Sequence, residues 1–309
     1  MSTLRVDDRE LLAFAELVGA EGPVAVEGSR TRWHVGGAVA EGTTLVRAPV
    51  GIVEYRPEEM TVQVRAGTAV ADLHAELAAR GQRSALPERG GTVGGAVAVG
   101  ENGVAVLGRG SVRTSVLQVR YVSAEGALVT GGGPVVKNVS GFNLPKLIVG
   151  SLGTLGLVAE VVLRTNPVPA SGRWLAAQGA APLAVRDAVL RPSAVLWDGV
   201  TTWVHLEGHR GDVDAETRVL ERLAAFEAVD GPPPLPPHRW RLAPSDVVDF
   251  ATRGAGEFVG SIGVGTVWAD RPQPPGPADP AAAIVSQRMK ERFDPTNRLN
   301  PGRRPGWTR

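Results

Sequence analysis

The sequence predicts an α+β fold built from two units. Runs of alternating or β-branched residues, typical of strands, are interspersed with stretches whose apolar residues recur at helical spacing. The composition also changes near Pro167, because glycine-rich motifs precede it and most of the seven tryptophans follow it. A length of 309 residues agrees with two domains.

The N-terminal segment predicts a helix over residues 7–18, in which Asp7 caps the first turn with Glu10 three residues later. Its apolar face consists of Leu11, Phe14, Ala15 and Val18. Short strands are expected to follow at residues 23–26, 45–47, 51–55 and 61–65. The alternation in the last of these, TVQVR, predicts one buried and one solvated face.

Regular elements continue through the rest of the first unit. Thr68 is placed to cap a helix that ends before Gly81. We then expect a hairpin at residues 115–130, a short helix at residues 143–149 and a strand at residues 157–163. The motif at residues 150–156 imitates a dinucleotide fingerprint, but a strand follows it where a Rossmann unit requires a helix, so that fold is excluded.

A proline pair, Pro167 and Pro169, marks the boundary of the second unit. Beyond it we expect two strands, at residues 202–207 and 262–268, and two helices, at residues 216–227 and 281–293. Two proline-rich loops are expected at residues 232–237 and 272–280. The final sequence, FDPTNRLNPGR, contains consecutive turns that would place Asn300 at a fixed position.

Composition excludes several classes of protein. The formal net charge is +1, which gives no electrostatic case for a nucleic acid or an acidic partner. The chain has no cysteine, which excludes disulfides, Fe–S clusters and thiolate zinc sites on this chain. The N-terminus has no secretory apolar region, and no apolar run approaches the roughly 18–20 residues that cross a bilayer. We therefore expect a soluble, cytoplasmic protein without a transmembrane segment.

The stretch from Gly90 to Arg113 is the strongest indication of a ligand. Eight of the 21 residues from Gly90 to Gly110 are glycine, separated by small or β-branched residues. Such a stretch favours a backbone that approaches something closely or adopts positive φ, as under a flat or phosphorylated ligand. The alternative is a set of tight turns in a β-rich region. The motif is not a P-loop.

A second glycine, Gly28, follows a short apolar run and is followed by Ser29. A strand that runs into Gly-Ser-x-Thr offers successive N–H groups and hydroxyls, which suits a pyrophosphate. The alternative is a plain β-turn.

No catalytic side chain stands out. His205 and His209 have the i, i+4 spacing of zinc ligands on a helix, but they lie in a predicted strand and turn, so no metal site is expected. The chain has neither a Gly-x-Ser-x-Gly elbow nor a cysteine nucleophile. A site for a ligand without an evident catalytic residue suits a cofactor that performs the chemistry itself.

Six motifs, in this order, resemble one known family. They are Gly28-Ser29, GIVEYRPEEMTVQVRAGT (51–68), GTVGGAVAVG (91–100), GSVR (110–113), KNVSGFNLPKLIVGSLGTLGLVAEV (137–161) and LNPGR (299–303). This order is typical of FAD-binding PCMH-type flavoproteins of the vanillyl-alcohol oxidase class, and within that class the chain is most similar to the FAD-binding subunits of bacterial glycolate oxidases. The resemblance covers residues 20–168 and the last dozen or so, and it is weak over residues 171–285.

The resemblance implies a PCMH-type FAD-binding domain of two subdomains over residues 1–168. A smaller α+β cap would cover residues 169–280, and a C-terminal helix and tail, residues 281–309, would return to the FAD-binding domain. The residues implied to bind FAD are Gly28, Ser29, Arg30, Thr31, Arg32, Pro87, Thr92, Gly94, Gly95, Val99, Gly100, Glu101, Asn102, Ser111, Val112, Gly153, Gly156, Val158 and Asn300.

The resemblance also implies an FAD-dependent oxidoreductase that acts on a CH–OH group of a 2-hydroxy acid such as glycolate. Electrons would pass to an acceptor or partner, with a catalytic flavoprotein subunit and an Fe–S subunit as implied partners. Membrane association, at the inner face, would arise only through these partners. FAD is expected to be non-covalent, because Arg30 or Thr31 stands where a linking histidine is expected; His34 is a weaker alternative anchor.

Two other functions remain open. The histidine-rich metal and base site of related 2-hydroxy acid dehydrogenases has no counterpart here, which favours a non-catalytic subunit that holds FAD or assists assembly. The chain could instead be an independent FAD-dependent alcohol oxidoreductase, in which Arg239, Arg241 and Arg253 would bind a substrate carboxylate.

Overall fold

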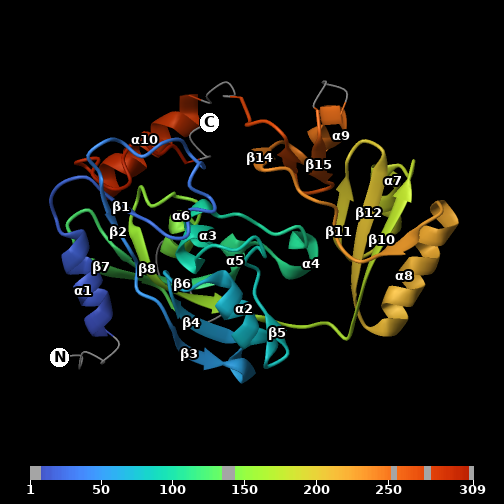
Figure 1. The fold of residues 1–309 in the computed structure, drawn as a ribbon, viewed down its shortest axis with the longest axis horizontal. Helices are drawn as coiled ribbons and strands as arrows, with labels where there is room; N and C mark the ends of the chain where they lie inside the picture. Colours follow the sequence, from blue (N-terminus) through green and yellow to red (C-terminus); the bar gives the residue numbers. More distant parts are fainter. Residues whose placement is uncertain (1–7, 134–142, 252–255, 275–279, 306–309) are drawn as a thin grey trace. The chain divides into compact units, whose positions relative to one another are not determined.

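A computed structural model describes residues 8–133, 143–251, 256–274 and 280–305 (Figure 1). The chain divides into two compact units. The first consists of Met1–Gly103, Ser111–Pro167 and Gly276–Arg309, and the second of Val104–Gly110 and Val168–Pro275. Nothing in the sequence indicated that Val104–Gly110 belongs with the second unit.

The first unit contains a five-stranded antiparallel sheet with the order β3-β4-β8-β6-β7. Its strands are β3 (Ile52–Arg56), β4 (Thr61–Arg65), β6 (Val116–Val122), β7 (Leu128–Gly132) and β8 (Leu157–Arg164). The predicted hairpin is confirmed as β6 and β7, and the β-branched run after the false fingerprint is confirmed as β8. The alternating and β-branched sequences of these strands suit a pleated sheet with buried faces.

The prediction of a solvated face on β4 is wrong. The side chains of its polar residues Gln63 and Arg65 both donate hydrogen bonds to the carboxylate of buried Glu160 on β8, at 2.8 and 2.5 Å. Glu10 of α1 (Asp8–Val18) also lies 3.6 Å from Arg65. The alternation is therefore real, but an ion-pair cluster occupies the polar face where water was expected.

Two short strands, β1 (Val24–Val26) and β2 (Thr44–Val46), pair in parallel in the first unit. The C-terminal tail extends this arrangement, because Leu299 forms a parallel bridge with Val24. The amide of Asn300 donates to the carbonyl of Val24 at 2.7 Å. Segments from both ends of the sequence thus run side by side in the same direction.

Arg298 fixes this tail. Its buried guanidinium donates to the carbonyl oxygens of Val18, Glu21, Gly22 and Ala124 at 2.8–3.1 Å. Burial lowers the pKa of Arg298, and the nearby Asp294 opposes that effect. The side chain of Asp294 in turn accepts from the amides of Arg298 and Leu299, at 3.0 and 2.7 Å.

Helices and short strands complete the first unit. The apolar face predicted for the first helix is confirmed, since Leu11, Phe14, Ala15 and Val18 of α1 are all buried; the predicted cap Asp7 lies outside the described residues. The other elements are η1 (Pro57–Glu59), α2 (Val70–Ala78), β5 (Gln82–Arg83), α3 (Val93–Val99), α5 (Val112–Ser115), α6 (Leu144–Ile148), β9 (Asn166–Pro167) and α10 (Pro280–Phe293).

Thr68 does not cap α2. Ala69 occupies the N-cap position, and the Thr68 hydroxyl instead lies 2.9 Å from the amide and 3.1 Å from the carbonyl of Gly51. The hydroxyl therefore connects the start of α2 to the chain entering β3.

The second unit contains a seven-stranded sheet with the order β13-β10-β12-β11-β15-β16-β14. Its strands are β10 (Ser171–Gln178), β11 (Pro192–Trp197), β12 (Thr201–Gly208), β13 (Glu227–Val229), β14 (His238–Arg241), β15 (Phe258–Ser261) and β16 (Thr266–Ala269). Its helices are α4 (Val106–Arg109), α7 (Pro182–Ala188), α8 (Arg210–Leu223), η2 (Pro244–Asp246) and α9 (Val247–Phe250).

Both faces of this sheet are packed. Val185 of α7 and Val213 and Leu220 of α8 join the core on one face, and Trp174, Trp203 and Trp268 lie in a separate cluster. The helix α4, from the inserted segment Val104–Gly110, packs on β11. A Cβ on Gly108 would lie 2.2 Å from Oγ of Ser193, so this contact requires glycine.

Two predictions in the second unit need correction. The strand expected over residues 262–268 is only partly found: residues 262–265 form the turn between β15 and β16, where Gly263 and Gly265 adopt φ of 80° and 81°, and β16 begins at Thr266. The helix expected over residues 216–227 begins at Arg210 and ends at Leu223, since Glu227 already pairs with β10 as part of β13.

Candidate functional site

Three parallel segments of the first unit end at one edge. Glu27 and Gly28 follow β1, Arg47 follows β2, and Asn300 follows the Leu299 bridge. The pairing of Val26 with Val46 sets β1 and β2 in register. In open α/β sheets, ligands commonly bind outside the carboxyl ends of parallel strands, where the loops that follow the strands can diverge.

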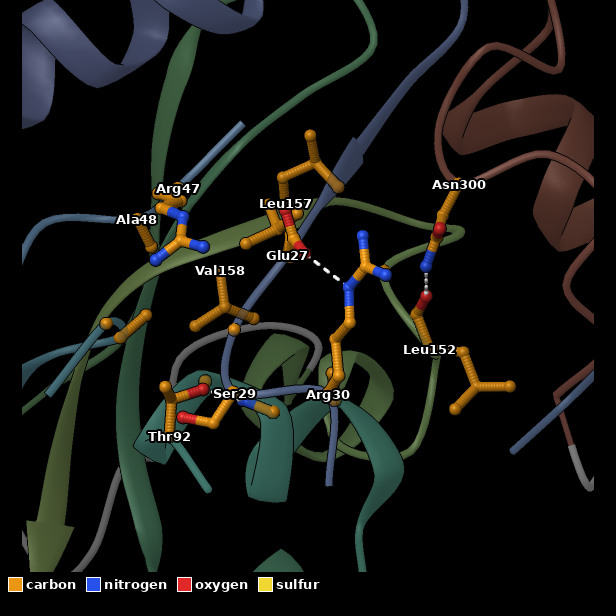
Figure 2. Close-up of a pocket in the computed structure, with 18 of the residues that line it drawn as sticks. Glu27, Ser29, Arg30, Arg47, Ala48, Thr92, Leu152, Leu157, Val158 and Asn300 are labelled. Atoms are coloured by element: carbon orange, nitrogen blue, oxygen red, sulfur yellow. Dashed lines mark hydrogen bonds and ion pairs between the residues drawn. The ribbon is translucent and has the colours of Figure 1, made fainter. Parts of the chain in front are cut away.

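A cavity of about 440 Å³ opens at this edge (Figure 2). Its apolar wall is formed by Val26, Ala48, Val50, Ala66, Ala98, Leu152, Leu157 and Val158. Its charged lining residues are Glu27, Arg30 and Arg47, and Ser29, Thr92 and Asn300 add polar groups. An apolar cavity with a few polar groups at one side is typical of a cofactor site.

A smaller cavity of about 90 Å³ adjoins the first and shares Gly28, Ser29, Arg30 and Asn300 with it. It extends the lining to Thr31, Arg32, Trp33, Val35, Val99 and Arg303. We refer to the two cavities together as the cleft. The cleft is therefore apolar toward Ala48 and Val50 and rich in arginine toward Trp33.

The structure brings together most of the residues that the resemblance implied. Those that line the cleft are Gly28, Ser29, Arg30, Thr31, Arg32, Thr92, Gly94, Gly95, Val99, Gly153, Val158 and Asn300. Those that do not line it are Pro87, Gly100, Glu101, Asn102, Ser111, Val112 and Gly156. The first group gathers segments that lie far apart in the sequence.

Several residues outside the cleft have contacts within the protein. Buried Glu101 accepts from the guanidinium of Arg32 and, at 3.0 Å, from that of Arg89. The side chain of Asn102 accepts from the amide of Val112 at 3.0 Å, which joins the two ends of the excursion that carries α4. The hydroxyl of Ser111 accepts from the amide of Thr114 at 3.2 Å and caps α5.

The glycine stretch contains the helix α3, whose first turn borders the cleft. Thr92 caps it by accepting from the amide of Gly95 at 3.2 Å, and the amide of Gly94 donates to the carbonyl of Ala66 at 2.7 Å. A backbone that lies under a phosphorylated ligand would offer free amides to it, but these two amides already donate within the protein. The close approach expected from the glycines is found at Gly94, where a Cβ would lie 2.7 Å from that of Ala66.

The loop after β1 lies directly against this helix start. A Cβ on Gly28 would lie 2.6 Å from Oγ1 of Thr92, so the two motifs that suggested a phosphate site are in contact. Arg30 adopts a left-handed conformation, with φ of 57°, and its guanidinium pairs with Glu27 (Figure 2).

Asn300 closes one side of the cleft. It has φ of 48°, and its side-chain amide donates to the carbonyl of Leu152 (Figure 2). Its buried Oδ1 has no hydrogen-bond partner within the described part of the chain. The same is true of Nη2 of Arg32, so the cleft borders one acceptor and one donor that a ligand could satisfy.

Two arginines of the cleft were missed from the sequence. Nη1 of Arg303 donates to the carbonyl groups of Trp33, Val35 and Gly37, and its guanidinium lies 4.6 Å from the centre of the Trp33 ring. Burial lowers the pKa of Arg303. Arg47 is exposed at the end of β2. Arg47 follows a short apolar run in the sequence, as Gly28 does. This position indicates a site residue only once β1 and β2 are known to pair in parallel, because both runs then end at the same edge.

The histidines and the arginines of the second unit form no comparable group. His205 on β12 stacks on Trp174 at 4.4 Å, and His209 is the N-cap of α8. Across the described residues there is no cluster of three or more side chains suited to a metal ion. Arg239 and Arg241 lie on β14, and Arg253 lies outside the described residues. No helix in the described ranges has the length and apolar character needed to cross a membrane.

Comparison with known sequences finds a family match over part of the chain. Residues 7–132 match a family described as FAD binding domain. The glycolate oxidase subunit GlcE of Escherichia coli (strain K12) is 33% identical over 208 residues, which are 64% of this chain and 59% of that protein. A D-lactate dehydrogenase of Anaerostipes hadrus is 34% identical over 154 residues, covering 48% of this chain and 32% of the relative. The chain thus matches less than two thirds of the length of either relative.

Solved structures agree on the fold. An alkyldihydroxyacetonephosphate synthase superposes with a TM-score of 0.68 at 15% identity, covering 95% of this chain and 73% of the other. The VAO-type flavoprotein MtVAO615 of Myceliophthora thermophila C1 superposes with a TM-score of 0.60 at 15% identity, covering 96% of this chain and 69% of the other. Residues 7–132 thus match the FAD binding domain family, and the α+β fold of the chain is similar to that of these two solved structures, as the sequence resemblance predicted.

Proposed function

We propose that this chain is an FAD-binding oxidoreductase subunit that takes part in the oxidation of a 2-hydroxy acid, with glycolate as the first candidate. The observation that carries the proposal is the cleft at the parallel edge, which combines an apolar wall with an arginine-rich end. Support for the substrate class comes from relatives named as a glycolate oxidase subunit, a D-lactate dehydrogenase and a D-2-hydroxyglutarate dehydrogenase.

The residues of the cleft fit FAD. Flat aromatic groups suit the apolar wall formed by residues such as Val26, Leu157 and Val158. A diphosphate suits the end that contains Arg30, Arg32 and Arg303. Oδ1 of Asn300 and Nη2 of Arg32 have no hydrogen-bond partner among the described residues. The polar atoms of such a ligand would supply one to each of them.

The proposed attachment of FAD is non-covalent. The loop after β1 presents Ser29, Arg30 and Thr31 to the cleft, and the chain has no cysteine. His34 is not among the residues that line either cavity.

Bound FAD would supply the acceptor for the two electrons that leave the substrate when its CH–OH group becomes a carbonyl. The chain's own residues would position the cofactor, exclude water along the apolar wall and balance the diphosphate charge. The electrons would then leave for a partner, and we propose a catalytic flavoprotein subunit and an Fe–S subunit in that role. The GlcE relative is itself named as a subunit, and so is glycolate oxidase subunit GlcD of Bacillus subtilis (strain 168), 29% identical over 160 residues.

The first test is the visible absorption spectrum of the purified chain, before and after acid precipitation. We expect a flavin band that moves to the supernatant, because nothing in the cleft is proposed to link FAD covalently. A band that stays in the pellet would refute non-covalent binding, and His34→Ala would then be the first variant. A chain that takes up no FAD on reconstitution would refute the proposed function.

Anaerobic addition of glycolate or D-lactate to the FAD-loaded chain then separates two functions. Bleaching of the flavin band is expected if the chain oxidises the substrate itself. A flavin that stays oxidised alone but bleaches with the partner subunits present would identify a subunit that holds FAD for the assembly.

A further inference from the structure

The connection between β13 and β14 has little length to spare. These two strands are the opposite edges of the seven-stranded sheet, so six strand spacings separate them. At about 4.8 Å for each spacing, the two edges of a flat sheet of this size are roughly 29 Å apart. The chain covers this distance between Val229, the last residue of β13, and His238, the first residue of β14. The nine steps from one Cα to the next reach only roughly 30–32 Å when they are fully extended.

The sequence of this connection suits an extended chain. Residues 230–237 read DGPPPLPP, in which five of the eight residues are proline. Consecutive prolines favour the polyproline II helix, which has three residues per turn and rises about 3.1 Å per residue, or about 28 Å over nine residues. Burial follows this period, because Pro236 is buried and Pro233 half-buried, whereas Pro234 and Pro237 are exposed. One edge of the connection thus faces the protein and another faces solvent.

The connection packs on the face of the sheet that carries the tryptophans. We define this tryptophan face by side chains that pack together in one cluster: Trp174, Ala194, Leu196, Trp203, Val259 and Trp268. Trp268 alternates along β16 with Val267 and Ala269, which belong to the core on the side of α7 and α8, so it points to the opposite face. Leu235 of the connection and Val104 of the inserted segment pack against the cluster.

The two edge strands that the connection joins are short. β13 forms three residue pairs with β10, and all three of its residues are exposed. β14 forms four pairs with β16. The side chain of Gln273 lies along the backbone of β14, since it accepts from the amide of Arg241 and donates to the carbonyl of the same residue, both at 3.0 Å. β13 is therefore the end of the connection with the weaker attachment.

We propose that residues 230–237 act as a strap that keeps the tryptophan face closed. Because the strap is nearly extended, it cannot move away from the face while both edge strands stay paired. Leu235 then leaves Val259 and Trp268 only when β13 or β14 separates from the sheet. The strap makes access to an aromatic, apolar surface depend on the release of an edge strand, and nothing in this device requires bound FAD.

The test adds length to the strap and measures access to the face beneath it. The chain has no cysteine, so Val259→Cys introduces a single thiol into the cluster that Leu235 covers. Insertion of Gly-Ser-Gly-Ser between Gly231 and Pro232 gives the strap enough length to lift while both edge strands stay paired. We expect this insertion to speed labelling of the thiol by a maleimide at least about tenfold, because the local opening becomes more frequent.

Two controls separate this opening from a general loosening. Val204→Cys places a thiol at a similarly buried residue of the core on the helix side, and the strap insertion should not change its labelling rate. The same four residues inserted between Gly208 and His209, in the connection from β12 to α8, should not speed labelling of Val259→Cys. The proposal is overturned if the strap insertion leaves the labelling of Val259→Cys unchanged, if it speeds both thiols equally, or if both insertions act alike.

Acrylamide quenching of tryptophan fluorescence gives a second measurement that needs no added cysteine. Three of the seven tryptophans of the chain lie on the tryptophan face, so a strap that lifts should make the total fluorescence easier to quench. The quenching constant should rise in the strap insertion variant and stay at the wild-type value in the variant with the insertion after Gly208. An equal constant in the wild type and the strap insertion variant would contradict the proposal even if a cysteine variant failed to fold.

Discussion

At the scale of single residues, Arg303 combines two roles that can be separated. It satisfies three carbonyl groups of the loop at residues 33–37, and it contributes charge to the cleft. Arg303→Gln is expected to lower the free energy of unfolding by about 2–3 kcal/mol, because it removes charged donors from buried carbonyl groups. Urea denaturation of the FAD-free chain measures this effect. Arg304→Gln, at an exposed neighbour, should change stability by less than about 0.5 kcal/mol.

The two tyrosines give a second prediction at this scale. Burial raises the pKa of Tyr121 above its ordinary value of 10.0, and burial also raises that of Tyr55. The folded state therefore retains these phenolic protons more strongly than the unfolded state does. Stability should be unaffected below pH 10 and should fall as the pH rises above it, because the unfolded chain then releases protons first.

Absorbance at 295 nm follows tyrosine ionisation directly. In Tyr55→Phe, which leaves Tyr121 as the remaining tyrosine of the 309-residue chain, we expect ionisation to begin above the value measured in urea. Coincident titrations in buffer and in urea would contradict the assigned burial effect.

At the scale of elements, the approach of α3 to the residue after β4 depends on one glycine. A Cβ on Gly94 would lie 2.7 Å from that of Ala66, and both residues line the cleft. Gly94→Ala should therefore displace α3, lower the free energy of unfolding by about 1–3 kcal/mol and weaken FAD binding.

Gly95→Ala is the informative comparison. The nearest atom to a Cβ there is Oγ1 of Thr92 at 3.1 Å, so stability should change little while the added methyl group enters the cleft. FAD affinity should fall without a matching loss of stability. Thermal unfolding and fluorescence titration separate the two variants, and equal stability losses would contradict this division of roles.

At the scale of the whole molecule, the sequence predicted the α+β class, most elements and the main loops of the cleft. Those features depend on local patterns, such as the alternation in β6 and the glycines at 28 and 94. The contacts between elements that lie far apart in the sequence were harder to predict. The solvated face expected on β4 is occupied by the Glu160 ion pair, which depends on contacts between residues 95 positions apart. Arg47 and Arg303 were missed because their importance depends on which strands are parallel.

The membership of the inserted segment is another feature that no local pattern encodes. Val104–Gly110 lies inside the glycine-rich stretch, yet it belongs to the second unit through contacts of Gly108 and Arg109 with Ser193 and Glu207. These partners follow it by more than eighty positions in the sequence. Composition alone assigns such a segment to its neighbours in the chain.

The contacts of Arg298 have a consequence for native-state hydrogen exchange. One guanidinium bonds carbonyl groups at the end of α1, in the turn before β1 and at Ala124, with up to 280 positions between the partners. Opening any one of these segments removes support from the others. The end of α1, the strand β1 and the tail around Leu299 should therefore lose protection against exchange together, as one cooperative unfolding unit assembled from opposite ends of the sequence.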